Sequence, residues 1–287
     1  MKKHKICKIL LVILAIFLCV AFYELLGICV AYKKQPEVSN TTKKETKNGS
    51  WNECSENTER AVIIEKNPEA LLQRVRLIKN AKKEIILSTF AFQSDESGKL
   101  ILGALHDAAD RGVHIRLLVD GMESWIDMEG NPYFYGLSSH ENVEIKLYNK
   151  ANPLKPWKMM GRMHDKYLIA DGKRYILGGR NTHNYFLGDF PGHKNYDRDV
   201  LVVCDEPEKE NSVNQLLEYF ETIWEQEDSG YFHDNKKLAN RKSVKNAVLE
   251  LQNGYQKYFE ENKERICDTD YTDETFETEK IALVSNP

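Results

Sequence analysis

The chain has no excess of positive charge. Its 287 residues include 40 Lys and Arg against 44 Asp and Glu, which gives a formal net charge of −4. Proteins that bind nucleic acids non-specifically are usually basic, because they must neutralise phosphates. The overall charge therefore argues against a general nucleic-acid binder, while a local basic patch is still compatible with it.

Cysteine is also scarce. Three of the six cysteines belong to the apolar amino-terminal segment or its edge: Cys7, Cys19 and Cys29. Cys204 follows a run of valine and leucine and is expected to be a buried thiol. Cys54 and Cys267 flank the folded region and would be able to pair in an oxidising compartment, but the sequence does not fix their connectivity. The cysteines therefore do not identify the redox compartment.

The longest run without charge lies at the amino terminus. Ile9 to Tyr23 contains no charged residue, and the apolar run resumes after Glu24 and ends near Ala31. This length suffices for one transmembrane helix, whereas the apolar core of a signal peptide is usually shorter. We expect an uncleaved membrane anchor over residues 1–32. A removed signal peptide, cleaved at Cys29-Val30-Ala31, is the alternative.

Lysines flank this segment on both sides. They are Lys2, Lys3, Lys5 and Lys8 before it, and Lys33 and Lys34 after it. The positive-inside rule therefore says little about orientation. The short basic tail weakly favours a single-pass protein whose main domain lies outside the cytoplasm.

Helices and strands alternate after a polar segment at residues 33–60, which is typical of a solvated linker. Hydrophobic periodicity predicts a helix from Asn67-Pro68-Glu69, where proline suits the first turn. Further strands are expected at Glu84–Phe92, Val113–Gly121, Val143–Tyr148 and Asp199–Cys204, and helices at Leu100–Arg111, Val213–Trp224 and about Leu238–Lys263. The first strand-helix-strand unit predicts a parallel pair with a right-handed crossover. The pattern indicates an α/β fold with a mixed central sheet flanked by helices.

One stretch has the features of a catalytic site. Residues 163–171 are predicted to form a β-strand that places His164 and Lys166 two residues apart. Side chains at i and i+2 of a strand point to the same face, so both can meet one phosphate. An imidazole can attack phosphorus, and a neighbouring ammonium can balance the charge of the phosphate. A hairpin after the strand would bring the amide of Asn181 into the same site.

The pattern His-x-Lys-x4-Asp-x6-Gly-Gly-x-Asn, which runs from His164 to Asn181, resembles the HKD signature of the phospholipase D superfamily. Six constrained positions at fixed offsets make the pattern specific, and a plain surface hairpin is the alternative. The resemblance covers roughly residues 62–225. Gly-Gly-Arg-Asn followed by Tyr185-Phe186-Leu187-Gly188 is most similar to the cardiolipin synthase branch.

The resemblance implies chemistry through a phosphohistidine. In this family two motif histidines meet, and one forms the covalent intermediate while the other protonates the leaving alcohol. By resemblance His164, Lys166 and Asp171 are catalytic, and Asn181, Lys166 and Gly179 bind the phosphate. Asp171 is better explained as a carboxylate that stabilises the hairpin turn. No cluster of metal ligands accompanies the motif, so we expect neither a metal nor another cofactor.

Two further carboxylates follow the motif. Asp197 and Asp199 are candidates to orient His164 through a hydrogen bond. Capping of the strand that begins at Asp199 is the alternative role for both.

A basic and apolar segment precedes the motif. Its cations are Lys150, Lys155, Lys158 and Arg162, and they alternate with Leu154, Trp157, Met159 and Met160. Cations beside amphipathic side chains suit an anionic lipid headgroup at a membrane surface. Lys155, Trp157, Lys158 and Arg162 are therefore candidates for the approach of substrate or membrane, and a solvated loop is the alternative.

The chain carries one complete motif, because His183 and His193 have no lysine two residues later. The second half-site is expected from a second copy about a twofold axis or from a C-terminal lobe. Lys280–Pro287, after the acidic stretch Asp268–Glu279, favours the lobe. The expected division is an anchor at 1–32, a linker at 33–60, a phospholipase D-like lobe at 61–228, a helical extension at 229–266, and an acidic linker with the start of a possible second lobe at 267–287.

We predict a membrane-anchored phosphodiesterase or phosphatidyltransferase that acts on a phospholipid and is similar to cardiolipin synthases. One alternative is a nuclease that works as a homodimer, with nucleic acid as the less favoured substrate. Another is an inactive half that serves as a membrane-bound interaction module. The sequence names neither the headgroup nor the acceptor.

Overall fold

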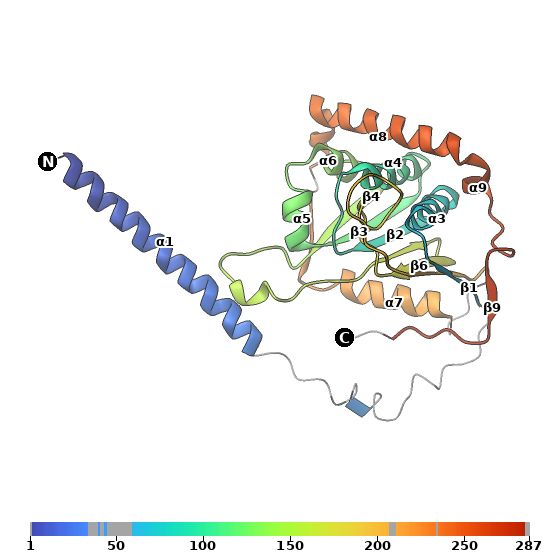
Figure 1. The fold of residues 1–287 in the computed structure, drawn as a ribbon, viewed down its shortest axis with the longest axis horizontal. Helices are drawn as coiled ribbons and strands as arrows, with labels where there is room; N and C mark the ends of the chain where they lie inside the picture. The colour runs from blue at the N-terminus through green and yellow to red at the C-terminus, as the bar shows by residue number, and fades with distance from the viewer. Residues whose placement is uncertain are drawn as a thin grey trace.

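The computed structural model describes residues 2–33, 40, 43–44, 59–206, 211–233 and 235–284. Most of the predicted linker, together with Cys54, lies outside these residues. Helix α1 (Lys2–Lys33) extends away from the rest of the protein (Figure 1). Within the described residues, it contains the one stretch long and apolar enough to cross a membrane, Lys5–Lys33.

A mixed sheet of nine strands forms the centre of the folded part. In spatial order the strands are β8 (Ser229–Tyr231), β4 (Val143–Tyr148), β3 (His114–Asp120), β2 (Glu84–Thr89), β5 (Tyr167–Ala170), β6 (Arg174–Gly178), β7 (Asp199–Val203), β1 (Glu59–Ile64) and β9 (Phe276–Thr278). The pairs β2–β3 and β3–β4 are parallel, and the other pairs are antiparallel. The predicted fold class is therefore confirmed, including the parallel pair β2–β3.

Helices cover both faces of this sheet (Figure 1). The helices and short 3-10 turns are α3 (Asn67–Asn80), α4 (Glu96–Asp110), α5 (Gly121–Asp127), α6 (Pro132–Ser138), η2 (Pro156–Lys158), α7 (Ser212–Trp224), η3 (Lys236–Asn240), α8 (Lys242–Glu261) and α9 (Lys263–Cys267). The two faces have separate cores, because successive residues of a strand point to opposite sides. Ile85 and Leu87 of β2 pack with α3 and α4, whereas Ile86 packs with α7.

Strand β1 was missed by the sequence analysis, which placed its first two residues in the linker. The strand pairs with β7 and begins at Glu59, whose side chain is buried. The Glu59 carboxylate accepts hydrogen bonds from the backbone N–H and the hydroxyl of Ser212, at the start of α7. The linker therefore ends before residue 59. The start of the strand was missed because its first residue, Glu59, is acidic, and acidic residues are rarely buried.

Most residues of the acidic stretch Asp268–Glu279 are exposed, as expected of a linker, but the stretch is also bonded to the domain. Buried Arg76 donates to the carbonyl oxygens of Asp268 and Asp270 and pairs with Glu274 at 2.9 Å. Its guanidinium lies 3.9 Å from the ring centroid of buried Tyr271. The acidic residues therefore have basic partners in the domain, and this packing holds the segment against α3.

The residues that follow also pack on the domain. Strand β9 pairs with β1 and forms the edge of the sheet, and Leu283 donates its backbone N–H to the side chain of Gln215 on α7. Ile281 and Leu283 contact the core beneath α7. The segment up to residue 284 therefore does not extend outward as the start of a separate lobe.

Asp171 forms the turn between β5 and β6. Its backbone has a φ of 54°, in the left-handed region that aspartate tolerates better than most residues. Its carboxylate accepts hydrogen bonds from the backbone N–H groups of Lys82, Lys83 and Glu84 at 2.7–3.1 Å. The motif aspartate therefore fixes the start of β2 to the motif hairpin.

We expect Asp171→Ala to lower the free energy of unfolding by about 2–3 kcal/mol, because three backbone donors lose a charged acceptor. Asp171→Asn should lose less, since asparagine also tolerates positive φ and keeps one acceptor oxygen. Urea unfolding in detergent micelles measures both changes. The exposed Asp189 supplies the control Asp189→Ala. Equal stabilities of the Asp171→Ala and Asp189→Ala variants would contradict this role.

Candidate active site

His164 and Lys166 precede strand β5 instead of lying within it. The strand begins at Tyr167, although the ladder continues through the hydrogen bond from Gly178 N–H to the carbonyl oxygen of Lys166. Lys166 is buried and its Nζ donates to the backbone oxygen of His164 at 2.6 Å, whereas His164 is exposed. The two side chains are thus held together at the end of β5, with the lysine behind the histidine.

Phe90 joins the groups of this site and was not identified from the sequence. Its ring centroid lies 4.7 Å from that of His164, in an edge-on contact. The guanidinium of Arg162 and the ammonium of Lys166 lie 5.1 and 5.3 Å from the same ring. Aromatic faces attract cations, so Phe90 holds both positive groups beside the imidazole. The antiparallel register of β2 and β5 brings Phe90 to this position, and a single sequence does not reveal that register.

The buried carboxylate of Asp120 fixes the chain before His164. It accepts two hydrogen bonds from Arg162, at 2.6 and 2.9 Å to one oxygen, and a third at 3.0 Å to the other. It also accepts the backbone N–H of Met163 at 3.1 Å. Arg162, which we expected to face an approaching membrane, is therefore directed into the site.

The charges around His164 favour a neutral imidazole. Partial loss of solvent lowers the pKa of His164, and the positive charge of Lys166 lowers it further. The carboxylates of Asp165 and Asp120 oppose this shift. Within the described part of the chain, neither ring nitrogen has a hydrogen-bond partner. A neutral and unpartnered imidazole can act as a nucleophile.

Lys166 has a strongly altered proton affinity. Burial lowers the pKa of Lys166 to about 8, while the carboxylates of Asp165 and Asp197 raise it. A lysine with this pKa is mostly protonated at pH 7, but its charge is not fully compensated by its surroundings. An anion bound beside it would supply that compensation.

The side-chain NH₂ group of Asn181 is available to bind a ligand. Its Oδ1 accepts the backbone N–H of Ala91 at 3.2 Å, next to Phe90. Backbone hydrogen bonds between Thr182 and residues 91 and 93 hold this segment beside β2. The Asn181 Nδ2 has no partner among the residues that the structure describes, so it can donate to an anion.

The glycine pair of the motif makes room for carboxylates. A Cβ atom at Gly178 would overlap the Asp199 side chain, and one at Gly179 would overlap the Asp197 carboxylate. The Gly179 N–H already donates to the carbonyl oxygen of Arg198, at 3.4 Å. The structure thus shows Gly179 as the residue that admits Asp197, with its own N–H directed to Arg198.

Neither of the two candidate carboxylates contacts His164. Asp199 is buried and forms ion pairs with Arg74 at 2.9 Å and Arg180 at 3.2 Å. Asp199 therefore pairs with two buried guanidinium groups instead of the imidazole of His164. The charge of Asp197 acts on Lys166 and not on His164.

Asp165, between the histidine and the lysine, is the carboxylate that sequence reasoning overlooked. Its charge acts on both His164 and Lys166, and it accepts the hydroxyl of Tyr219 on α7 at 2.8 Å. Asp171 lies at the other end of β5, about 13 Å away for four residues of strand. The structure therefore does not bring Asp171 into the cluster.

The other approach residues lie beyond this cluster. Lys158 forms an ion pair with Asp228 at 2.6 Å. Lys155 and Trp157 are exposed, and Lys155 has no ion-pair partner among the described residues. Of the four residues proposed for the approach, only Arg162 reaches the groups around His164.

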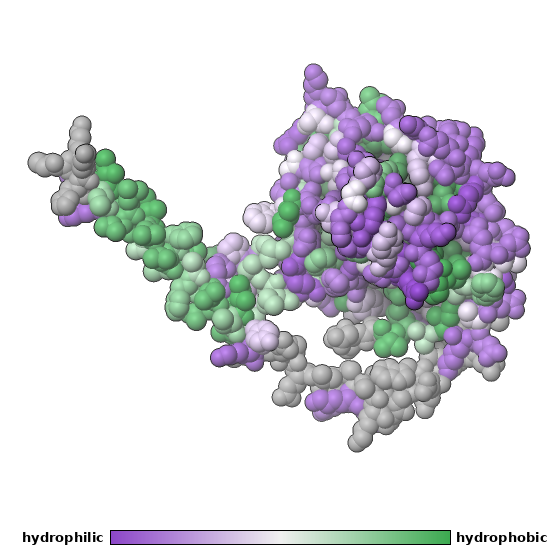
Figure 2. All heavy atoms as spheres, viewed as in Figure 1, coloured by the Kyte–Doolittle hydropathy of each residue, from purple (hydrophilic) through white to green (hydrophobic). Residues whose placement is uncertain are grey.

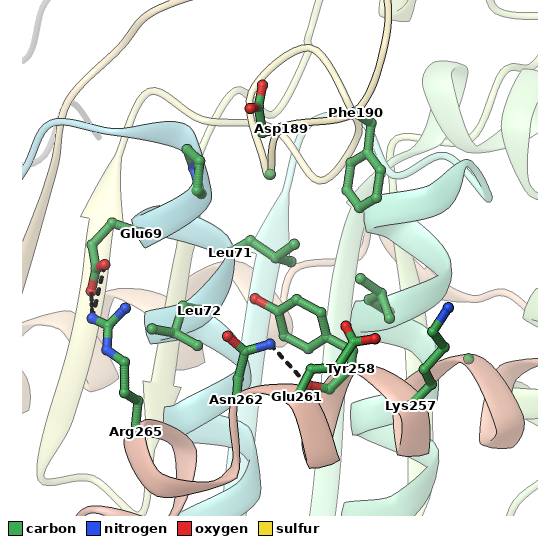
Figure 3. Close-up of a pocket in the computed structure, with 14 residues that line it drawn as sticks. Glu69, Leu71, Leu72, Asp189, Phe190, Lys257, Tyr258, Glu261, Asn262 and Arg265 are labelled. Carbon is green, nitrogen blue, oxygen red and sulfur yellow. Dashed lines mark hydrogen bonds and ion pairs between the residues drawn. The ribbon is translucent and has the colours of Figure 1, made fainter.

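A separate hollow of about 470 Å³ lies between α3 and α8 and holds none of these residues. Figure 3 shows Leu71 and Leu72 at its floor and Tyr258 facing them, with the Arg265–Glu69 ion pair at its rim. None of the chemical groups of the motif lines this hollow.

Comparison with known proteins supports the resemblance. Residues 74–224 match the family described as cardiolipin synthase, PLD-like domain. An uncharacterized protein of Helicobacter pylori strain J99 is 30% identical over 212 residues, which are 69% of this chain and 39% of that protein. Cardiolipin synthase C of Escherichia coli K12 is 29% identical over 171 residues, 55% of this chain and 34% of that protein.

The solved structure of phosphatidylserine synthase from Haemophilus influenzae has a similar fold. Its TM-score is 0.50 at 17% identity, and the match covers 77% of this chain and 48% of that one. The chain thus spans less than half the length of each of these proteins. The family match over residues 74–224, more than half of the chain, leads to one conclusion: this chain belongs to the phospholipase D superfamily, in the family of cardiolipin synthase PLD-like domains.

Proposed function

We propose that this chain supplies half of a phospholipase D-type site that transfers a phosphatidyl group of a membrane phospholipid to water or an alcohol. The main support is the cluster around Phe90. A neutral imidazole and two cations lie around its ring, and Asn181 is bonded to the backbone of the next residue, Ala91. Such a set can attack a phosphodiester and stabilise the charge that develops on its oxygens.

The proposed reaction has two steps at phosphorus. A nitrogen of His164 donates its lone pair to phosphorus, the new N–P bond forms, and the P–O bond to the leaving alcohol breaks. A second histidine gives its proton to the departing oxygen. In the second step it accepts a proton from the incoming water or alcohol, whose oxygen forms a new P–O bond while the N–P bond breaks and its electron pair returns to His164. Lys166 and the Asn181 amide hold the phosphoryl oxygens through both steps.

The second histidine must come from another half-site. We propose a second copy of this chain as the source, placed by a twofold axis that brings each exposed His164 to its counterpart. Additional polypeptide with its own motif is the alternative.

The charges near the site favour a lipid over a nucleic acid. Lys150 donates to the carbonyl oxygen of Tyr231, Lys158 pairs with Asp228, and Arg162 pairs with Asp120. A protein that follows a nucleic-acid backbone needs a series of uncompensated cations. The segment instead leaves apolar side chains exposed, and α1 is apolar enough to hold the domain at a membrane.

We expect His164→Ala to reduce release of labelled glycerol from phosphatidylglycerol vesicles by at least about 10³-fold, because the nucleophile is lost. The exposed His193 supplies the control His193→Ala, which should retain activity. Denaturation in SDS at mildly alkaline pH during turnover, which preserves an N–P bond, should trap a phosphorus label from the phosphatidyl group on the wild type and not on His164→Ala. Retained turnover in the His164→Ala variant would rule out this role.

The same preparations separate the lipid and nuclease functions. The wild type should leave labelled single-stranded DNA intact under conditions in which it cleaves phosphatidylglycerol. Cleavage of DNA alone, with His164 dependence and strong inhibition by salt, would favour the nuclease.

The pKa of Lys166 predicts how anion binding depends on pH. With a pKa of about 8, most of the ammonium charge is lost between pH 7 and pH 9. Affinity for tungstate, an anion that mimics phosphate, should fall about tenfold over that interval, in proportion to the protonated fraction. Isothermal titration calorimetry at both pH values measures this change. Lys166→Arg should bind tungstate with little change over the same interval, because arginine stays charged.

The contribution of Lys166 to the free energy of unfolding should rise with pH, whereas the affinity for tungstate falls. The folded-state pKa of Lys166 is depressed, so the unfolded chain binds more protons between about pH 8 and the ordinary lysine pKa near 10.4. The contribution of Lys166 to the free energy of unfolding therefore rises with pH in this window. An affinity that is flat from pH 7 to pH 9 in the wild type would contradict the assignment of Lys166 as the phosphate ligand.

A further inference from the structure

Five large apolar side chains are exposed on two neighbouring segments. Trp125 and Ile126 lie on α5, and the loop between β4 and β5 carries Leu154, Trp157 and Met160. Their exposed fractions run from 46% for Trp157 to 78% for Leu154. Soluble surfaces usually expose such side chains singly, whereas groups of them mark a surface of interaction. We call these five residues the apolar platform.

The two segments of the platform are joined at their bases. The start of α5 at Gly121 lies against the backbone of Asn149 and Lys150, where no Cβ atom would fit. Arg162, at the end of the loop, pairs with Glu123 of α5 at 3.2 Å. In Figure 1, α5 and the loop lie on the side of the domain that faces α1, and Figure 2 shows apolar surface on this side as well as along α1.

Helix α1 is attached to this same loop. Gly27 is buried against Pro156, and a Cβ atom at Gly27 would overlap the proline ring. The hydroxyl of Tyr23 donates to the carbonyl oxygen of Leu154 at 2.8 Å. The loop is therefore held at one defined level of the apolar helix, close to its C-terminal end.

The position of the Gly27–Pro156 contact along α1 matches the depth of a bilayer surface. At about 1.5 Å per residue, the helix from Ile9 to Gly27 spans about 27 Å. The hydrocarbon core of a typical bilayer is about 30 Å thick. If α1 crosses the bilayer with Ile9 near one edge, Gly27 and Pro156 lie at the opposite interface. Tryptophan and tyrosine are enriched at that depth, which suits both Trp157 and Tyr23.

From these observations we infer that the apolar platform inserts into the interfacial layer of the membrane that α1 crosses. The inference deepens the proposed function and rests on it for the identity of the substrate. Arg162 and Met163 connect the platform to His164 through Asp120. The reactive groups would then meet headgroup phosphates of the leaflet at which α1 ends, while the lipid stays in the bilayer.

A bilayer explains the platform better than a second copy of the chain does. The apolar surface of α1 is almost entirely exposed along the candidate span, and the platform lies beside its end. A bilayer that surrounds α1 would therefore also cover the apolar platform. The exposed Lys155 adds a cation next to Leu154, which suits an anionic lipid surface.

Quenching of tryptophan fluorescence tests the insertion directly. The full chain is placed in vesicles of phosphatidylcholine and phosphatidylglycerol, whose acyl chains carry bromine near the glycerol end. Variants keep only one of Trp125, Trp157 and Trp224, with phenylalanine at the other positions and at Trp51. We expect bromine to reduce the emission of Trp125 and Trp157 at least twofold, and to leave that of the buried Trp224 nearly unchanged. Equal quenching of Trp125 and Trp224 would overturn the inference.

Activity tests whether the platform delivers lipid to the site. The double variant Trp125→Ser with Ile126→Ser should lower turnover of vesicle phosphatidylglycerol at least tenfold, yet turn over a soluble short-chain phosphatidylglycerol as the wild type does. Leu249 is an exposed leucine on α8, so Leu249→Ser is the matched control and should change neither rate. Equal loss on both substrates would overturn the inference, because the platform would then belong to the reaction itself.

A substitution at the contact between α1 and Pro156 tests the inference independently. Gly27→Leu should separate α1 from Pro156 and lower vesicle turnover severalfold, whereas Ala21→Leu on an exposed part of the helix should not. If the wild type turns over neither lipid, the proposed function fails while the quenching result still decides the insertion. Absent quenching, together with crosslinking between platforms of two copies, would assign this surface to a dimer interface instead.

Discussion

The arrangement of this site depends on one buried carboxylate. Asp120 ends β3, caps the start of α5, and accepts hydrogen bonds from both Arg162 and the backbone of Met163. A buried carboxylate is costly unless charged or strongly polar donors surround it. Asp120 meets that requirement by joining the turn between β3 and α5 to the segment before His164. The position of His164, the direction of Arg162 and the attachment of α5 are consequences of the same set of bonds.

The motif residues divide between folding and chemistry. Asp171 ties the hairpin to β2, the two glycines admit carboxylates, and buried Arg180 donates to the carbonyl oxygens of Ile64 and Glu65. These positions are constrained because any larger or uncharged side chain would disturb the backbone around them. His164, Lys166 and Asn181 are left to face a ligand. A signature of six fixed positions therefore encodes a rigid frame as much as a set of reactive groups.

Periodicity in the sequence predicted most of the fold. The strand Val143–Tyr148 was predicted with its observed bounds, and the parallel pair β2–β3 was expected from one strand-helix-strand unit. Strand β1 and the packed acidic segment were missed for a common reason. Both are held by charged residues, such as Glu59 and Arg76, whose partners lie far away in the sequence.

The site was only partly predictable for a similar reason. The spacing of His164 and Lys166 follows from local geometry, and the structure does hold the two together. The parts played by Phe90, Asp120 and Asp165 depend on the register of β2 and β5 and on the capping of α5. Asp199, which we proposed to orient His164, instead pairs with the buried Arg74 and Arg180, and the sequence alone does not reveal these partners.

Electrostatics links the proposed chemistry of the site to its proposed position at a membrane. Lys166 is buried behind an exposed imidazole, and its depressed pKa shows that its surroundings do not fully compensate its charge. A phosphodiester between Lys166 and Asn181 would supply the missing negative charge, so ligand binding and compensation of the buried lysine are one event. Such a site on an open surface would bind many soluble anions equally well. A platform that holds the site at the level of lipid headgroups would make phospholipid phosphate the anion present at the highest local concentration. In this arrangement, selectivity arises from position as much as from contacts within the site.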